Sequence, residues 1–330
     1  MGDAAMGQPT LILTQSDLRR LVTRADYLQA VEEGFRASSE DRASSPAPLH
    51  VEADSGGLHG KAAFLQAERA YLAVKVNSNF PDNARNGEMP TIQGALLLFD
   101  GTNGALLAIL DSIELTIMRT AAATALAARF LAREDARTLM ICGCGAQARA
   151  QAAAVADVRR FERGFAWDAD PVRARSFAAD MTDLGFPFEV SHLLGDAAQA
   201  SDVIVTCTTA REPFLDETHV KPGAFIAAVG ADSPSKCEIA PALMAKASVF
   251  ADVTNQALTM GDSLHAALSP GDIRGELADL VSGRLIGRSR DDEIIIFDST
   301  GTAIEDVASA AVAYERAVDT DVARIGLADA

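Results

Sequence analysis

The feature that most constrains the fold is a glycine-rich turn between an apolar segment and a helix-forming segment. Residues 138–142 (Thr-Leu-Met-Ile-Cys) are typical of a buried strand, and Gly-Cys-Gly-Ala-Gln-Ala follows at 143–148. In this order the glycines allow a tight turn and a close approach of the backbone to a pyrophosphate, and Ala148 allows close helix–strand packing. The first N–H groups of the helix also favour negative charge. The sequence therefore predicts a dinucleotide-binding, Rossmann-type fold.

A carboxylate follows the next predicted strand, residues 163–167. Asp168 lies 25 residues after Gly143, where an acid can accept hydrogen bonds from the ribose hydroxyls of adenosine. The alternative to a dinucleotide site is that residues 143–148 form a purely structural glycine turn in another kind of α/β domain. Because Asp168 would repel a 2′-phosphate, we expect NAD(H) as the preferred cofactor. Arg173 and Arg175 could compensate, so NADP(H) stays open.

The hydrophobic pattern divides the chain into two regions. Residues 50–99 alternate like antiparallel strands, and a turn at 100–104 leads to one more strand at 105–110. From residue 138 onward, strands alternate with helical segments. The second pattern predicts a parallel sheet that is covered on both faces. Asp170 is expected to cap the helix after the second strand. Other helices are expected at residues 16–22 (with Ser16 as the N-cap), 24–37, 115–131 and 303–317.

Composition excludes several classes of protein. A chain of 330 residues with a formal charge of −17 is unsuited to binding nucleic acid. No apolar run is long enough to span a membrane, and the first ten residues do not resemble a signal peptide. The four cysteines lack the spacing of a disulfide framework, so the expected location is the cytoplasm. Cys142 and Cys144 are interpreted as a strand and a turn residue, and we expect no metal site.

Two basic residues stand in apolar surroundings. Lys75 follows Ala73 and Val74 in a predicted strand, where a buried cation requires a partner. The alternative is a lysine at a sheet edge with its amine in water. Arg119 lies on a predicted helix, and its guanidinium could bind a carboxylate through two parallel hydrogen bonds. The alternative for Arg119 is a salt bridge at the junction of two domains.

Asp232 follows a predicted strand and Gly230. This order places it at the carboxyl edge of the sheet, where doubly wound folds bind ligands. A carboxylate there could exchange a proton with a substrate nitrogen. The alternative is a turn cap within Asp232-Ser233-Pro234.

Several segments appear in one characteristic order: residues 74–77 with Pro81, 90–94, 115–122, the glycine turn, 229–232 and 297–301. Taken together, they resemble the ornithine cyclodeaminase/mu-crystallin family, from about Thr10 to Ala317. The resemblance implies a Rossmann-type NAD(P)-binding domain, residues 119–305, inserted into a mixed α+β domain made of residues 1–118 and 306–330. It also implies that the second domain binds the substrate and forms a homodimer through its sheet.

The resemblance also implies roles for individual residues. Lys75 and Arg119 would hold the substrate carboxylate, and Lys75 and Asp232 would be catalytic. Thr91 is a further substrate-side candidate, as is His50, which takes the place of an arginine that many members offer. A histidine makes a weaker, pH-sensitive contact there. The residues expected at the cofactor are Gly143, Gly145, Ala146, Gln147, Asp168, Thr206, Thr208, Gly230 and Thr120.

The expected reaction is hydride transfer from NAD(P)H to Cα of an α-imino acid. Δ1-Pyrroline-2-carboxylate, which would give proline, is the preferred substrate by resemblance. The first alternative is ornithine cyclodeamination, which uses NAD catalytically and releases ammonia. The second is a crystallin-like protein that binds nucleotide without turnover. A lysine, an arginine and an acid together favour an enzyme, because a binding role requires no proton donor.

Overall fold

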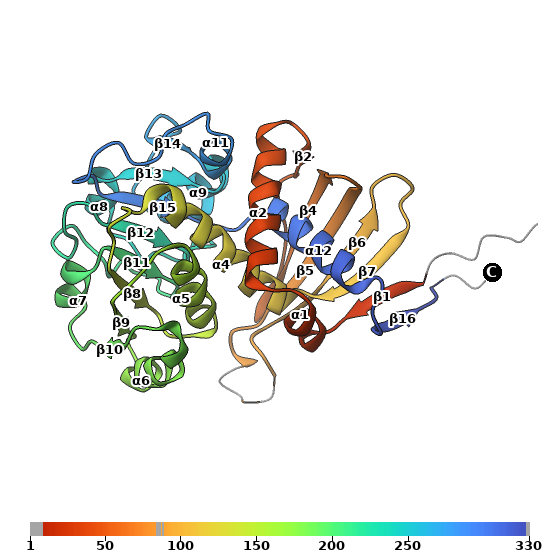
Figure 1. Ribbon diagram of the computed structural model, residues 1–330, viewed down its shortest axis with the longest axis horizontal. Helices are drawn as coiled ribbons and strands as arrows, with labels where there is room; N and C mark the ends of the chain where they lie inside the picture. Colours follow the sequence, from red (N-terminus) through yellow and green to blue (C-terminus); the bar gives the residue numbers. More distant parts are fainter. Residues whose placement is uncertain (1–8, 84–86, 88, 328–330) are drawn as a thin grey trace, which may run out of the picture. The chain divides into compact units, whose positions relative to one another are not determined.

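The computed structural model describes residues 9–83, 87 and 89–327. The chain forms two compact units (Figure 1). Both ends of the chain build the terminal unit, Met1–Arg119 with Thr302–Ala330, and the central unit is the continuous segment Thr120–Gly301. In the part of the chain that is described, no helix is both long enough and apolar enough to cross a bilayer.

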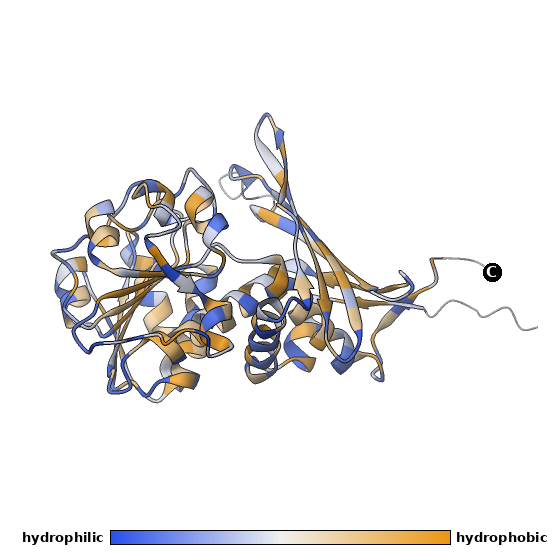
Figure 2. Cartoon of the chain, turned by 90° about the horizontal axis from the view of Figure 1, so that it is seen from above, coloured by the Kyte–Doolittle hydropathy of each residue, from blue (hydrophilic) through white to orange (hydrophobic). Residues whose placement is uncertain are grey.

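The terminal unit is a mainly antiparallel sheet with helices on one side (Figure 2). The strand order is β16-β1-β7-β6-β5-β4-β2, with β3 paired to β4, and β1 and β7 are parallel. Helix α12 packs on α2, β4 and β5. The elements are β1 Thr10–Leu13, α1 Gln15–Leu21, α2 Arg24–Ser39, β2 Ala43–Ser44, β3 Leu49–Ala53, β4 Gly56–Gln66, β5 Ala70–Asn79, β6 Ile92–Asp100, β7 Leu106–Asp111, α12 Ala303–Ala317 and β16 Ala323–Ile325.

Alternation along β5 decides which side chains reach the helices. Tyr71, Ala73 and Lys75 are buried, whereas Leu72 is 40% exposed and Val74 is partly exposed. Successive side chains of a strand point to opposite faces. The buried series therefore lies on the face that the helices cover, and Lys75 enters the interior of the unit from this face.

Two helix starts differ from the sequence-based expectation. The first helix begins at Gln15, with Thr14 rather than Ser16 as its N-cap, because Thr14 and Asp17 form a reciprocal capping box. Helix α4, Ser112–Leu131, begins three residues before the expected 115. The carboxylate of Asp111 accepts the backbone N–H of Glu114 at 2.7 Å and so starts this helix earlier.

The central unit is a parallel sheet in the order β10-β9-β8-β11-β12-β15-β13-β14 (Figure 1). The predicted fold class, a Rossmann-type sheet inserted into a mixed α+β unit, is confirmed. Strand β14 was not expected. The elements are β8 Thr138–Cys142, α5 Ala146–Val158, β9 Arg163–Trp167, α6 Pro171–Asp180, β10 Phe188–Val190, α7 Leu194–Ala200, β11 Val203–Thr206, β12 Phe225–Ala228, α8 Pro241–Lys246, β13 Ser248–Ala251, α9 Thr254–Met260, α10 Asp262–His265, β14 Ile273–Glu276, α11 Leu277–Val281 and β15 Ile295–Asp298.

The register of the central strands aligns their carboxyl ends. Thr206, the last residue of β11, lies opposite Cys142 of β8 and Ala228 of β12, and Ala228 lies opposite Asp298 of β15. Strands β11, β12 and β15 are fully buried, as expected for a sheet with both faces covered. The loops that leave these strands therefore start from one common edge, where α/β folds place their ligands.

Candidate active site

The glycine turn after β8 has the geometry that an anion requires. Gly143 has φ of 92°, and a Cβ there would lie 2.7 Å from Cγ2 of Thr208. Gly145 is the N-cap of α5, and a Cβ there would meet no heavy atom within 4 Å among the described residues. No side chain of the described chain caps the first turn of α5. The start of α5 thus has room beside Gly145 and no capping side chain, and the first N–H groups of a helix favour negative charge.

Asp168 is tied to this turn. Its Oδ2 accepts the backbone N–H of Cys144 at 2.7 Å, and its Oδ1 accepts that of Asp170 at 2.8 Å. The carboxylate of Asp170 in turn accepts the N–H of Val172 as the N-cap of α6, which confirms its expected role. The acid at the end of β9 thus lies directly beside the glycine turn, as a partner for an adenosine ribose would.

The other residues expected at the cofactor lie in three places. Ala146 and Gln147 are the first two residues of α5, and Thr120 is a buried residue of α4. Thr206 is the last residue of β11, and Thr208 and Gly230 lie in the loops after β11 and β12. All three donate hydrogen bonds to the buried carboxylate of Glu238. Sequence reasoning did not single out Glu238.

Asp232 lies in the loop after β12. Its Oδ1 accepts a hydrogen bond from Nζ of Lys236 at 2.6 Å, and its side chain is 54% exposed. Its backbone N–H donates to the carbonyl oxygen of Gly230 at 3.2 Å. The side chain of Asp232 is therefore accessible to solvent.

The terminal unit contains a buried group of four charged side chains, the charged cluster: Lys75, Arg119, Glu305 and Asp306. Nζ of Lys75 lies 2.9 Å from Oδ1 and 2.8 Å from Oδ2 of Asp306. Arg119 donates from Nε to Asp306 and from Nη1 to Glu305, both at 2.9 Å. The lysine amine also donates to Oγ1 of Thr116 at 3.2 Å. The structure thus brings together Lys75 and Arg119, 44 residues apart in the sequence, through two acids.

The start of α12 explains the position of these acids. Thr302 and Glu305 form a capping box that fixes the first turn of the helix. Glu305 and Asp306 lie in this first turn, where the helix dipole favours negative charge. Acids in a first turn are a common feature of exposed helices, so the sequence offered no signal that these two are buried.

Burial and neighbouring charges set the protonation of the charged cluster. Burial lowers the pKa of Lys75 from its ordinary 10.5 to about 8, with Arg119 and Lys61 adding to this and Asp306 opposing it. Burial opposes ionisation of Asp306, but the charges of Lys75 and Arg119 hold its pKa below its ordinary value. Lys75 can therefore bind an anion as a cation and still exchange a proton near neutral pH.

The two weaker substrate-side candidates lie on other strands of the terminal unit. His50 is exposed on β3, and its Nδ1 lies 3.0 Å from Nδ1 of His59 on β4. Thr91 precedes β6, and its carbonyl oxygen accepts the N–H of Phe80 at 2.8 Å.

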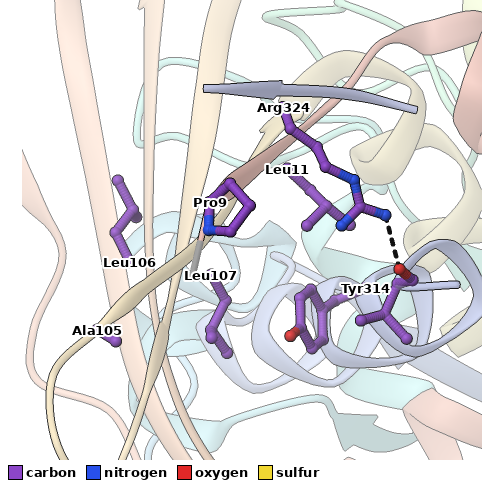
Figure 3. A pocket seen from close by; sticks show the side chains of 8 residues that line it. Pro9, Leu11, Ala105, Leu106, Leu107, Tyr314 and Arg324 are labelled. Atoms are coloured by element: carbon purple, nitrogen blue, oxygen red, sulfur yellow. Dashed lines mark hydrogen bonds between the residues drawn. The ribbon is translucent and has the colours of Figure 1, made fainter. Parts of the chain in front are cut away.

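Within the described ranges, no three His, Cys, Asp or Glu residues are arranged to hold a metal ion. A small hollow in the terminal unit has a volume of about 30 Å³, far below the few hundred Å³ of typical ligand sites (Figure 3). Its lining is mostly apolar and consists of Pro9, Leu11, Ala105, Leu106, Leu107, Tyr314, Val318 and Arg324.

The parallel sheet with its open glycine turn defines a dinucleotide-binding α/β protein. A profile of the ornithine cyclodeaminase/mu-crystallin family matches residues 8–321. The chain belongs to this family, which confirms the resemblance seen in the sequence.

Relatives by sequence carry different substrates in their names. The chain is 34% identical to an alanine dehydrogenase of Archaeoglobus fulgidus over 318 residues, covering 95% of this chain and 97% of the relative. It is 33% identical to an iminosuccinate reductase of Paracoccus denitrificans over 319 residues, covering 95% and 98%.

Solved structures agree with these relatives. An archaeal alanine dehydrogenase, described as a dimer with bound NAD, superposes with a TM-score of 0.93 at 32% identity and covers 97% of this chain and all of its own. The Δ1-pyrroline-2-carboxylate reductase of Thermococcus litoralis, in complex with NADH and L-proline, has a TM-score of 0.91 at 32% identity, covering 95% and 99%. NAD-dependent reduction or oxidation of imino and amino acids is thus common to these members of the family.

Proposed function

We propose that this protein is an NAD(H)-dependent reductase of a 2-imino acid, with Δ1-pyrroline-2-carboxylate as the first candidate substrate and L-proline as its product. The observation that carries the proposal is the buried pair of cations, Lys75 and Arg119, in a member of a family of NAD-dependent enzymes. NADH, when bound, supplies a hydride to the imine carbon. The C=N electron pair passes to the nitrogen, which takes up one proton.

In this proposal the terminal unit holds the substrate. Asp306 orients both cations, because it accepts from Nζ of Lys75 and from Nε of Arg119. Positioned cations of this kind can fix a carboxylate, and so fix the carbon that receives the hydride. Lys75 is a proposed catalytic residue because its lowered pKa lets it move a proton near pH 8. Thr91 and His50 are proposed as further contacts to the substrate.

The central unit holds the cofactor in this proposal. The first N–H groups of α5 would bind the pyrophosphate, and Asp168 would accept the ribose hydroxyls, which favours NAD(H) over NADP(H). Asp232, whose side chain is half exposed, is the proposed relay of a proton from water to the substrate nitrogen. The remaining residues proposed at the cofactor are Gly143, Gly145, Ala146, Gln147, Thr206, Thr208, Gly230 and Thr120.

One experiment separates this proposal from its alternatives. The purified protein is supplied with Δ1-pyrroline-2-carboxylate and NADH in one reaction, and with L-ornithine and catalytic NAD in another. The proposal expects NADH consumption and proline in the first reaction only. Proline and ammonia from ornithine, without NADH consumption in the first reaction, would establish a cyclodeaminase instead. Cofactor binding without turnover of any imine or amino acid would establish a binding protein.

We also propose that the protein is a homodimer that pairs through the sheet of the terminal unit. The face of this sheet opposite its helices carries partly exposed apolar side chains, including Leu72, Val74 and Phe99. Apolar patches of this kind are typical of interfaces between protein chains. Sedimentation at micromolar concentration is expected to give twice the mass of the chain, and Leu72→Glu is expected to shift the mass to that of the monomer.

The proposed location is the cytoplasm, because all four cysteines are free thiols.

A further inference from the structure

The loops after β11 and β12 are joined by one buried carboxylate, that of Glu238. Its Oε2 accepts the hydroxyl of Thr206 at 2.6 Å and the backbone N–H of Gly230 at 2.8 Å. Its Oε1 accepts both the backbone N–H and the hydroxyl of Thr208, each at 2.7 Å. An ionised carboxylate offers about four acceptor sites, so all of them are used.

The donors require an acceptor at both oxygens. The two backbone N–H groups can only donate, and one of them meets each oxygen. The hydroxyl of Thr208 already accepts the N–H of Ala210 at 3.1 Å, so its own proton is directed to Glu238. A glutamine of the same size would turn an NH₂ group against the donors of one of the two loops.

Glu238 also acts on the glycine turn, through Thr208. The methyl carbon of Thr208 would lie 2.7 Å from a Cβ at Gly143, so this side chain packs tightly against the turn. On its other side, a Cβ at Gly230 would lie 2.4 Å from Oε1 of Glu238. The carboxylate therefore sets the spacing of three segments at the carboxyl edge of the sheet: the glycine turn, the loop after β11 and the loop after β12.

The backbone beneath Glu238 is itself fixed. Oδ1 of Asp262 accepts the N–H of Glu238 at 2.7 Å and that of Ile239 at 2.9 Å. Glu238 is fully buried, which raises the pKa of its carboxyl, while its hydrogen bonds favour the ionised form. A group with no exposed surface cannot touch a ligand, so its effect on one must pass through the loops it holds.

We propose that Glu238 is a positioning residue of the cofactor site, whose carboxylate holds the glycine turn and the loops after β11 and β12 at the spacing that a dinucleotide requires. This inference rests on the proposed function in one respect, namely that NAD(H) binds at the turn. It adds to that function a residue that shapes the site without contacting the cofactor.

The test compares Glu238→Gln with Glu293→Gln in the full-length protein. Glu293 is a matched control: it is 8% exposed, lies in the same unit and accepts hydrogen bonds from Ser248, Ser289 and Arg274. It precedes β15, however, and so lies at the amino edge of the sheet. The dissociation constant of NADH is measured by fluorescence titration, and the unfolding midpoint by thermal scanning.

Glu238→Gln is expected to raise the dissociation constant of NADH about 10- to 100-fold, because hydrogen bonds to a charged group are lost at the loops. Glu293→Gln is expected to change it less than about twofold while it also lowers the midpoint. Glu238→Asp, which keeps both acceptor oxygens, is expected to bind NADH more tightly than Glu238→Gln. If Glu238 only stabilised the fold, Glu238→Gln and Glu293→Gln would each weaken NADH binding in proportion to the drop in unfolding midpoint. This result would overturn the inference.

The outcomes also separate this inference from the proposed function. If the wild-type protein binds no NADH, both fail together. If it binds NADH and Glu238→Gln binds equally well, only the inference fails. Should Glu238→Gln not fold, Glu238→Asp and Glu293→Asp decide: shortening Glu238 is expected to raise the dissociation constant of NADH about 3- to 10-fold, and shortening Glu293 less than about twofold. Equal effects of the two substitutions would overturn the inference.

Discussion

Removal of the Asp306 carboxylate is the change that tests the charged cluster most sharply. Asp306 is the group that raises the pKa of Lys75 against burial, and its oxygens lie 2.8 and 2.9 Å from the amine. Asp306→Asn keeps the size of the side chain and removes the charge. The lysine is then left buried beside Arg119, which favours the neutral amine.

The magnitude follows from the distance. Two unit charges 2.8 Å apart attract each other by about 6 kcal/mol at an effective dielectric constant of about 20, which corresponds to about four pH units. Even a third of this attraction would bring the pKa of Lys75 from about 8 to below 7. Loss of one partner of a buried ion pair also lowers the free energy of unfolding, by about 3–5 kcal/mol.

The assay is the pH profile of kcat/KM for imine reduction, measured well below the unfolding midpoint of each variant. The protonated amine binds the carboxylate, so the wild-type profile is expected to fall above about pH 8. In Asp306→Asn this fall is expected to begin below pH 7, with at least a tenfold loss at pH 7.5. The substrate has its own ionisation, which affects both proteins equally. It therefore cancels in the ratio of kcat/KM of the variant to that of the wild-type protein. Asp319→Asn, an exposed acid of the same unit, is the control. A fall that stays near pH 8 in Asp306→Asn refutes the assigned role of the charged cluster.

Three further predictions concern the central unit. Gly145→Ala is expected to weaken NADH binding at least tenfold with little change in the unfolding midpoint, because a Cβ there points into open space. Gly143→Ala is expected to lower the midpoint as well, because the φ of Gly143 is 92°. Calorimetry gives the midpoints and NADH titration the affinities, and equal midpoints of the two variants would contradict this prediction. Asp168→Ser is expected to lower the ratio of kcat/KM for NADH to that for NADPH at least tenfold, and an unchanged ratio would remove Asp168 from the ribose site. Burial and the nearby Asp262 carboxylate raise the pKa of Asp298 from 3.8 to about 7, so the folded protein holds a proton that the unfolded chain releases between these values. The free energy of unfolding is therefore expected to fall as pH rises from about 4 to 7. Measured by urea unfolding at a series of pH values, this free energy is expected to change less steeply with pH in Asp298→Asn than in the wild-type protein, and an equal dependence on pH would contradict the assignment.

Local sequence signals were sufficient for the parallel sheet and for the antiparallel region before it, whereas the insertion of one unit into the other followed from the family resemblance. In the strands, the spacing of apolar residues fits only one backbone conformation. In the turn after residue 142, the glycines do the same. The last helix was predicted from Ala303 to Ala317 or later and spans Ala303–Ala317, and the cap at Asp170 was correct. Errors occurred where two side chains competed for the same cap, as at Thr14 and Ser16, and the capping partner Asp17 decided the outcome.

The site was predicted only in part, because its contacts join residues distant in sequence. Lys75 and Arg119 drew attention as cations among apolar neighbours, but Asp306 lies 231 residues after Lys75, at a helix start where acids are common. Glu238 lies in a loop with no regular pattern, and only the register of β11 and β12 shows that it meets Thr206 and Gly230. Nothing local to such residues distinguishes a buried carboxylate from an exposed one.

The most direct measurement of the proposed reaction follows a deuterium atom. The protein is incubated with Δ1-pyrroline-2-carboxylate and NADH that carries deuterium in the transferable position at C4, and the product is analysed by mass spectrometry and NMR. The account predicts proline with one deuterium at Cα and one equivalent of NAD⁺ for each proline formed. Proline without deuterium at Cα, or no consumption of NADH with this or any other 2-imino acid, would contradict it.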